Sequence, residues 1–326
     1  MRSVRVPLIV LACACLLVPH SPLWSQSGQA DLQRVLRDIK CLDGFVGFED
    51  ASQATPRVVY LFGPEINDAV VGDLKILTQL HDLKVENTRV TDRGLGFLKG
   101  MLELRAVSFS RNALGDASLI HVGALSRLEK LDLAETKIGD AGLAHLRGLT
   151  RLRNLEASGT QVSNAGLAEL AKSLPELKEL GLNATKISGQ GLAQVKRLTR
   201  LERLSLANTP ITDRGLAHLR TLTSLRELTL AGTKISDAGL AHLQGLTNLQ
   251  RLDLSNTPIT GAGLAHLAGL ARLQTLNLSD TQVNDANLAD LKGLTGLRQL
   301  VVEGARVTPT GAKTLQQVLP KLRIVR

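Results

Sequence analysis

LRELTLAGTKISDAGLAHLQGLTN, residues 225–248, is followed directly by LQRLDLSNTPITGAGLAHLAGLAR, residues 249–272, and the two stretches align without a gap. They share leucines, a central threonine and a glycine, which indicates an internal repeat of 24 residues. The threonine recurs at this period, with one interval of 25 residues, at Thr88, Thr136, Thr160, Thr185, Thr209, Thr233, Thr257 and Thr281. Asn112 fills the gap in the series, and a degenerate first unit begins at Val59. The sequence therefore predicts about eleven units over residues 59–326.

Each unit reads L-x-x-L-x-L-x-x-T-x-I-[ST]-D-x-G-L-A-x-L-x-x-L, with an extra residue near Pro175 and near Pro320. The L-x-L step predicts a short strand with both leucines inward. Leucines every three residues, as at Leu240, Leu243 and Leu246, indicate one face of a helix. Strands lie about 4.8 Å apart and helices need about 8–10 Å, so stacked units must curve. We expect an α/β solenoid with parallel strands on its concave face and helices on its convex face.

Three polar or small positions recur with the leucines. We expect the threonine hydroxyls to bond backbone groups of neighbouring loops, because buried polar groups need partners. A series of aspartates follows each Ser or Thr, and either residue type predicts a helix cap rather than acid–base chemistry: Asp68, Asp92, Asp116, Asp140, Asp213, Asp237 and Asp285. A recurring glycine indicates close approach of neighbouring backbones: Gly142, Gly166, Gly191, Gly215, Gly239 and Gly263.

This pattern resembles the leucine-rich repeats of secreted bacterial proteins that are abundant in planctomycetes. It is also similar to the cysteine-containing repeats of F-box proteins, with Thr where those place Cys. The resemblance covers residues 59–326. It implies the solenoid fold and an interaction module, and it supplies no catalytic residues to transfer.

Composition agrees with a regular aliphatic core. Aromatic residues make up only 2% of the 326 residues, while hydrophobic residues reach 44%. The charged fraction of 21% excludes a disordered chain, and three cysteines exclude a disulfide scaffold. The sequence contains no metal motif, glycine-rich phosphate loop or nucleophile motif, so we expect no enzymatic activity, metal or cofactor.

The first thirty residues predict an export signal. Arg2 and Arg5 precede an apolar run over residues 6–18, and small residues follow up to a cleavage region at residues 25–30. The run is short for a membrane span, although a retained anchor or a lipoprotein at Cys13 or Cys15 are alternatives. Cleavage would remove Trp24. We expect an exported protein, in the periplasm, at the cell surface or outside the cell, without a transmembrane span in the mature chain.

Residues 31–58 predict a cap on the first repeat, since terminal repeats must be shielded. An apolar helix face is followed by a GFVGF strand over residues 44–48 and a loop leading to Val58; the helix face is formed by Leu32, Val35, Leu36, Ile39 and Leu42. Cys41 lies near this stripe, and we expect a buried inert thiol, with an intermolecular disulfide as the alternative. At the other end, Ile324 and Val325 indicate a last strand without a helix.

Candidate binding residues flank the inward leucines on the concave strands. Tyr60 and Phe62 are the rings at the N-terminal edge, either as a binding patch or, the favoured interpretation, beneath the cap. Asp132 and Glu156 belong to an acidic cluster with Glu179, for which nothing completes a cation shell. Arg203 and Arg251 alternate with glutamates on adjacent strands, which favours cross-strand pairing over a charged binding site.

The remaining candidates are basic. Arg127, Arg151 and Arg153 lie beside the strands and could contact an acidic glycan, an anionic surface or an acidic protein. A helix-side column of His121, His145, His218, His242 and His266 is expected to face solvent rather than bind zinc. We expect a monomer that binds a macromolecule, a protein by preference and not a nucleic acid. A structural or adhesive envelope protein is the alternative.

Overall fold

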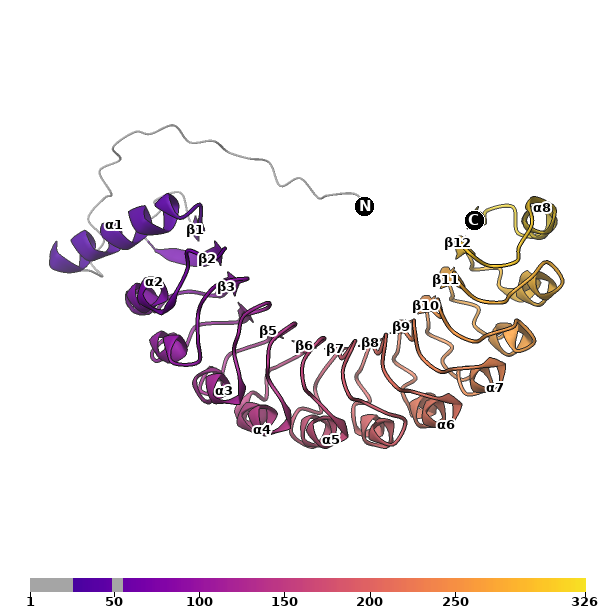
Figure 1. Cartoon of the computed structure of the whole chain (residues 1–326), viewed down its shortest axis with the longest axis horizontal. Coiled ribbons are helices and arrows are strands. Elements are labelled where there is room, and N and C mark those ends of the chain that lie inside the picture. Colours follow the sequence, from indigo (N-terminus) through magenta and orange to yellow (C-terminus); the bar gives the residue numbers. More distant parts are fainter. Residues whose placement is uncertain (1–25, 49–54) are drawn as a thin grey trace.

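The computed structural model describes residues 26–48 and 55–326, which form a single arc with the strands inside and the helices outside (Figure 1). The described strands make one 13-stranded sheet in which each strand pairs with its neighbours in sequence order. The first pair, β1 with β2, is antiparallel, and every later pair is parallel. The predicted solenoid is therefore confirmed, including the placement of strands on the concave face.

The strands stay in register because the repeat places the same leucine opposite its counterpart. Leu131 pairs with Leu155, and Leu155 with Leu180 across the 25-residue interval. The bounds are β1 (Phe45–Phe48), β2 (Pro56–Phe62), β3 (Asp82–Glu86), β4 (Ala106–Ser108), β5 (Lys130–Asp132), β6 (Asn154–Glu156), β7 (Glu179–Gly181), β8 (Arg203–Ser205), β9 (Glu227–Thr229), β10 (Arg251–Asp253), β11 (Thr275–Asn277), β12 (Gln299–Val301) and β13 (Arg323–Val325). The last of these is the terminal strand predicted from Ile324 and Val325.

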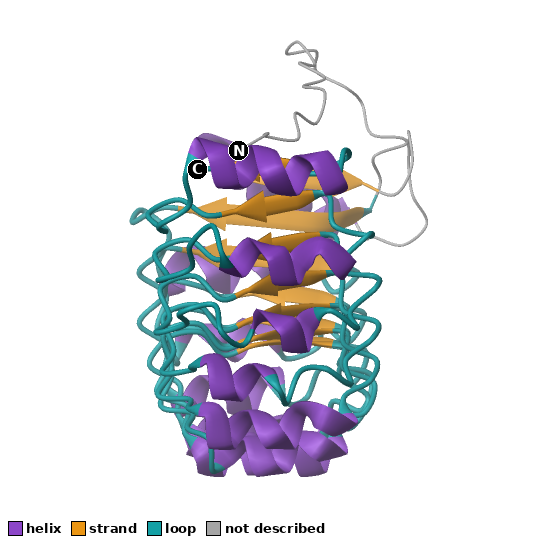
Figure 2. Ribbon diagram, turned by 90° about the vertical axis from the view of Figure 1, so that its right-hand side faces the viewer, coloured by secondary structure: helices purple, strands orange, loops and turns teal. Residues whose placement is uncertain are grey.

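The convex side consists mostly of single helical turns (Figure 2). Leucines spaced by three match the three residues per turn of a 3₁₀-helix, so they stay on one face without a full α-helix. The α-helices are α1 (Gln26–Cys41), α2 (Asp68–Gly72), α3 (Leu119–Val122), α4 (Asp140–Leu143), α5 (Asn164–Ser173), α6 (Asp213–Leu216), α7 (Asp237–Leu240) and α8 (Pro309–Val318). The 3₁₀-helices are η1 (Asp73–Ile76), η2 (Gly94–Leu98), η3 (Asp116–Ser118), η4 (Ala144–Gly148), η5 (Gly191–Arg197), η6 (Ala217–Thr221), η7 (Leu264–Leu267) and η8 (Asn287–Gly293).

The two longer units differ from the others in their helices. The helices α5 and α8 each run for ten residues, and they end shortly before Pro175 and Pro320, where the sequence has its extra residue. One more residue per unit accommodates the 3.6-residue turn of an α-helix. The insertion thus changes the convex side, while the strands that follow keep their pairing.

The core is a continuous column of aliphatic side chains between the sheet and the helices. Both leucines of each L-x-L step are buried, as at Leu131 and Leu133. Among the described residues, Phe97 and Phe109 are the rings buried in this column, and Phe109 occupies one of the leucine positions. Identical layers of Leu and Ile fill the space between units, which explains how the chain folds with so few aromatic residues.

The N-terminal segment caps the first repeat as predicted. Leu32, Val35 and Ile39 of α1 are buried against it, and β1 pairs with the free edge of β2. The second strand begins at Pro56, two residues before the predicted Val58. The prediction of a buried Cys41 is wrong: the thiol-bearing residue is exposed, because it lies about 200° around the helix from Ile39.

The predicted signal peptide lies mostly outside the described part of the chain. Residues 26–30, at its end, belong to the first turns of α1. No helix among the described residues is long and apolar enough to cross a bilayer.

The recurring threonines are buried, but their partners differ from the expectation. Each hydroxyl donates to the carbonyl three residues earlier in its own unit, at 2.5–2.7 Å, rather than to a neighbouring loop. The turn after each strand brings that carbonyl within reach. Asn112 is the exception, because its Nδ2 donates to the Val85 carbonyl of the preceding unit at 2.6 Å and its Oδ1 accepts the Thr88 N–H at 2.9 Å.

The recurring aspartates join neighbouring units instead of capping their own helices. Asp213 shows the arrangement: Oδ1 accepts the Ser236 N–H at 2.7 Å and Oδ2 accepts the Ser236 hydroxyl at 2.6 Å. We call this contact the aspartate staple, and it recurs in the pairs Asp68–Thr91, Asp92–Gly115, Asp116–Gly139, Asp140–Ser163, Asp237–Thr260 and Asp285–Thr308. The expected capping by Ser or Thr occurs at Ser163 and Thr308.

The staple is buried enough to affect ionisation. Burial alone would raise the pKa of Asp237, but the Thr260 hydroxyl and three backbone N–H groups bond its carboxylate and hold that pKa below its ordinary value. The recurring glycine makes room for the staple, since a Cβ at Gly239 would overlap the Asp213 carboxylate. The predicted close approach at the glycine column is therefore confirmed, and its cause is the aspartate of the preceding unit.

Candidate functional site

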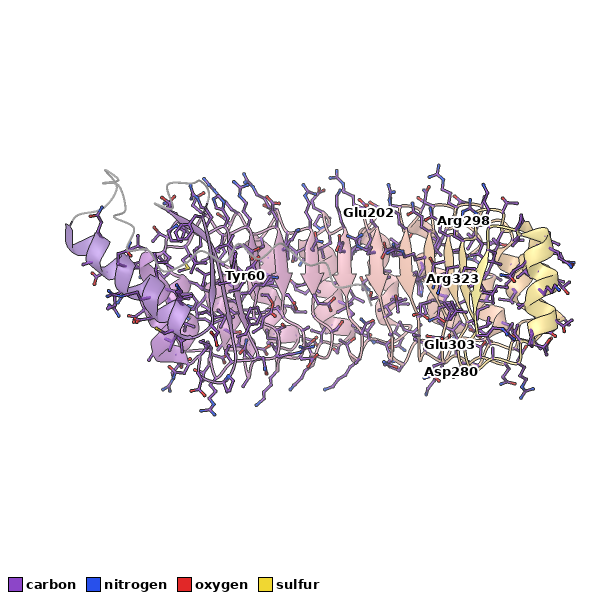
Figure 3. All side chains as sticks on the ribbon, turned by 90° about the horizontal axis from the view of Figure 1, so that it is seen from above. Tyr60, Glu202, Asp280, Arg298, Glu303 and Arg323 are labelled. Atoms are coloured by element: carbon purple, nitrogen blue, oxygen red, sulfur yellow. The ribbon has the colours of Figure 1, made fainter. Side chains whose placement is uncertain are left out.

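The concave face has a shallow hollow of about 490 Å³ over strands β3 to β8. Its floor is the alternate, outward set of strand residues, seen from above in Figure 3. Polar side chains dominate the lining, which contains Asp82, Lys84, Glu86, Ser108, Lys130, Asp132, Asn154, Glu156, Glu179, Gly181, Arg203 and Ser205. The hollow thus includes three of the predicted candidates: Asp132, Glu156 and Arg203.

Two acidic candidates are partly used by the backbone. Asp132 Oδ1 accepts the Ala134 N–H and Glu156 Oε1 accepts the Ser158 N–H, both at 2.9 Å. The other Asp132 oxygen lies 3.3 Å from the Ser108 hydroxyl. A Cβ at Gly181 would overlap the Glu156 carboxylate, so the missing side chain there is what lets Glu156 lie along the floor. These contacts fix the two carboxylates in place without gathering them around a cation.

The predicted cross-strand pairing is present at the C-terminal side of the hollow. Arg203 contacts Glu179 on β7 and Glu227 on β9, the latter at 3.7 Å. Arg251 contacts Glu227 at 3.2 Å. The Glu179 hydrogen bond is the main cause of the raised pKa of Arg203. The charges of this part of the face therefore neutralise one another, and exposed pairs of this kind contribute about 0–1 kcal/mol each.

The rings at the N-terminal edge form an open cluster. The Tyr60 centroid lies 5.5 Å from that of Phe45, on β1, and 6.5 Å from that of Phe62. Phe45 and Phe62 remain about half exposed, so the cap does not cover them. The Tyr60 hydroxyl donates to Asp82 Oδ2 at 2.9 Å. Burial, followed by the Asp82 contact, raises the pKa of Tyr60 to about 12.

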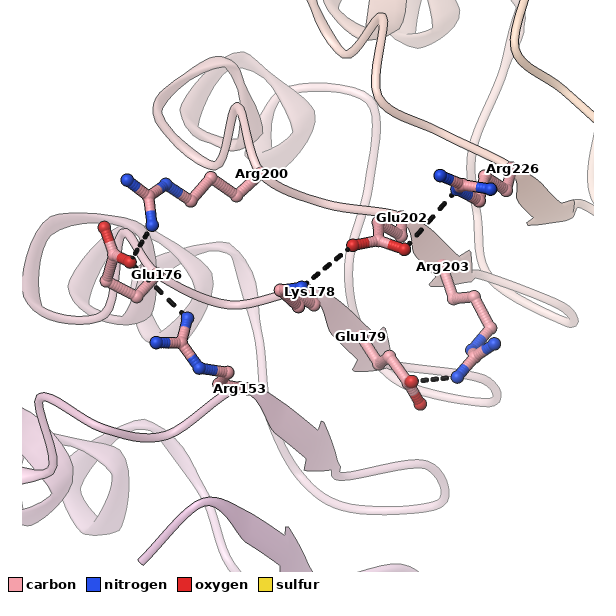
Figure 4. A network of polar contacts seen from close by, with 8 residues as sticks. All are labelled: Arg153, Glu176, Lys178, Glu179, Arg200, Glu202, Arg203 and Arg226. Carbon is pink, nitrogen blue, oxygen red and sulfur yellow. Dashed lines mark hydrogen bonds and ion pairs between the residues drawn. The ribbon is translucent and has the colours of Figure 1, made fainter. Parts of the chain in front are cut away.

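The basic flank is largely paired with glutamates (Figure 4). Arg127 contacts Glu103, Arg153 and Arg200 share Glu176, and Lys178 and Arg226 share Glu202. Arg151 is exposed and forms no ion pair with the described residues. The prediction overlooked these acids, although the repeat gives a signal for them: Glu103, Glu176 and Glu202 each lie 24 residues before a basic residue of the next unit.

Comparison with known proteins supports the same architecture. Models described as leucine rich repeat match residues 126–146, 223–283 and 247–307. The chain is a leucine-rich-repeat protein. A search of curated proteins found no match. The planctomycete-like and cysteine-containing affinities stay predictions.

Several solved leucine-rich-repeat structures are similar to this chain. An internalin (inlF) from Listeria monocytogenes is 20% identical with a TM-score of 0.63, over 91% of this chain and 94% of that one. The protein LIC12759 from Leptospira interrogans is 19% identical with a TM-score of 0.50, over 78% and 80%. The plant peptide hormone receptor RGFR1, in complex with RGF2, is 20% identical with a TM-score of 0.50; 78% of this chain covers 44% of the receptor chain. At these identities the likeness shows the fold alone.

The histidine column lies on the convex side of the leucine-rich repeats. His145 and His266 are exposed, and the other members are half-buried. His242 Nδ1 lies 2.7 Å from Arg220, and burial together with this arginine lowers the pKa of His242. Within the described ranges, no three His, Cys, Asp or Glu side chains are grouped to hold a metal ion.

Proposed function

We propose that this leucine-rich-repeat protein is an exported module that binds a partner protein through its concave face, without catalysis. The observation that carries the proposal is the contrast between two sets of positions. Inward and turn positions repeat almost unchanged along the chain, whereas the outward column changes from unit to unit: Tyr60, Lys84, Ser108, Asp132, Glu156, Gly181, Ser205, Thr229, Asp253, Asn277 and Val301. Folding requires the repeated set, so the varied and accessible set is available for recognition.

The chemistry of the hollow favours a protein over a small molecule. It is open and polar, with small residues such as Ser108 and Gly181 between acidic ones. Small-molecule sites are deeper and largely apolar. A broad polar surface suits many hydrogen bonds and ion pairs along an extended partner.

Two lines of support come from outside the face itself. The plant receptor with the same fold is described in complex with RGF2, which makes a polypeptide ligand a reasonable class for this fold. The basic and apolar start of the chain supports export.

A structural or adhesive role through the basic flank has less support. Of the three predicted arginines on that flank, Arg127 and Arg153 are already paired with glutamates. An acidic glycan or anionic surface would have to compete with these glutamates, which leaves Arg151 as the free charge.

Site-specific photocrosslinking in the cells that make the protein tests the proposal. A photoreactive residue at Ser205, on the concave strand β8, should capture a partner, and one at the exposed convex His266 should not. Replacing Ser205 by Trp should abolish capture from a second concave position, Thr229, by filling the face. Capture from His266 alone, or capture from Thr229 that Ser205→Trp leaves unchanged, would contradict binding at the concave face.

A further inference from the structure

The N-terminal end of the concave face carries a patch of rings and acids. We call Phe45, Tyr60, Phe62, Asp82 and Glu86 the ring–acid patch. Strand pairing assembles it, since Phe45 of β1 lies opposite Tyr60, and Phe62 of β2 lies opposite Glu86 of β3. Tyr60 marks its place in Figure 3. The hollow begins at the same strand, because Asp82 and Glu86 belong to its lining.

The exposure of these rings is unusual for this chain. It has seven aromatic residues in all, five Phe, one Tyr and one Trp, and three of them lie in the patch. Phe45 is 54% and Phe62 49% exposed, whereas Phe97 and Phe109 are buried in the core. The solenoid fills its core without rings, so packing does not explain why these three gather at the surface. Exposed rings grouped beside polar residues are typical of an interaction site.

The carboxylates of the patch lack cationic partners. Asp82 Oδ2 accepts the Tyr60 hydroxyl, but Asp82 Oδ1 is buried without a hydrogen-bond donor. Glu86 forms no ion pair or hydrogen bond with the described residues. Five acidic and three basic residues line the hollow, a formal charge of −2, although the chain as a whole carries +9. A positively charged ligand is therefore the complement of this part of the face.

The patch already shows that its rings accept a cation. Lys84 Nζ lies 4.6 Å from the centroid of Tyr60, within the usual range of a cation–π contact. The faces of Phe45 and Phe62 remain open to a second cation. An arginine guanidinium stacks on a ring while donating to a carboxylate in its plane, a combination that the Phe62–Glu86 pair offers.

We propose that the ring–acid patch binds an arginine side chain presented by an extended, basic segment of the partner protein. The guanidinium stacks on Phe62 and pairs with Glu86, and the segment continues along the hollow toward Glu156. The inference rests on the proposed function, because it names the chemistry of the partner at that concave face.

Tyr60 allows a direct binding measurement in the full-length chain. It is the only tyrosine, so in a Trp24→Phe background its emission reports on the patch alone. The probes are the acetylated peptide (Arg-Gly)4, its neutral citrulline counterpart (Cit-Gly)4, and (Glu-Gly)4. The variants are Phe62→Ala and Glu86→Gln. Asp253→Asn, which removes an acid from the same face on β10, is the matched control.

The arginine peptide should change Tyr60 emission to saturation, and the citrulline and glutamate peptides should not. Phe62→Ala and Glu86→Gln should each weaken binding about threefold or more, the size of one exposed cation–π or ion-pair contact, and Asp253→Asn should leave it within about twofold. Equal binding to all variants, saturation by the citrulline peptide, or a change in emission with protein concentration alone, which indicates a second copy as occupant, would overturn the proposal. Crosslinking at Ser205 is independent of these variants, so the patch can fail while the concave-face function stands.

Discussion

The aspartate staple gives a sharp test of how the units are held together. Gly239→Ala places a Cβ where the Asp213 carboxylate lies, so the carboxylate must leave its two hydrogen bonds to Ser236, at 2.7 and 2.6 Å. Hydrogen bonds to a charged group contribute about 1.5–3 kcal/mol each, and partial exposure of this site reduces that value. We expect Gly239→Ala to lower the free energy of unfolding by about 2–4 kcal/mol.

Gly245→Ala is the matched control, because a Cβ there meets nothing within 4 Å and the residue has no positive φ. It should be neutral or stabilise the protein by up to about 1 kcal/mol through the unfolded chain. Urea denaturation followed by circular dichroism measures both. Asp213→Ala should cost about as much as Gly239→Ala, and the double variant little more than either, because both changes break one contact. Equal midpoints for Gly239→Ala and Gly245→Ala would refute the staple as a source of stability.

Three further predictions concern single contacts. Thr209→Val should lower the free energy of unfolding by about 1–3 kcal/mol, measured by thermal denaturation, because the Leu206 carbonyl loses its 2.5 Å donor in a buried turn. Absorbance titration in the Trp24→Phe background should show Tyr60 ionising near pH 12, and Asp82→Asn should lower that pKa; since folding raises this pKa above its ordinary value of 10.0, the contribution to stability is complete below pH 10 and is lost as the pH rises toward 12. Glu176→Gln should change stability by less than about 1 kcal/mol in the same denaturation assay, with a smaller effect in high salt, because both of its arginine partners are largely exposed.

The fold was predictable because one period sets every layer. Leucine spacing alone determines which side chains face inward, the register of the strands and the direction of curvature. The two ten-residue helices were not predicted, although the extra residue near Pro175 and Pro320 was visible. The general pattern of a repeat indicates which residues are buried, while the pitch of a helix depends on how many residues connect two fixed strands.

The polar contacts were harder to predict because they depend on the next unit. A single repeat places Asp213 at the start of α6, where capping is the local expectation. In the stack, the N–H of Ser236 in the following unit lies within reach, and the carboxylate turns toward it. The flank ion pairs have the same origin, since the paired residues are separated by 23 or 24 positions. Sequence reasoning within one unit misses such partners, and comparing residues one period apart finds them.

One joint of the solenoid lacks the staple and adjoins the hollow. Gly189 stands where the other units have Asp or Asn, so no carboxylate reaches Thr212 of the next unit, and the backbone of Gly215 packs directly against Gly189. On the concave side of the same joint, Glu179 and Arg203 pair across β7 and β8. An exposed ion pair is a weak substitute for a staple. The units that border the hollow at its C-terminal end are therefore joined less firmly than their neighbours, so a partner that breaks the Glu179–Arg203 pair meets little resistance there.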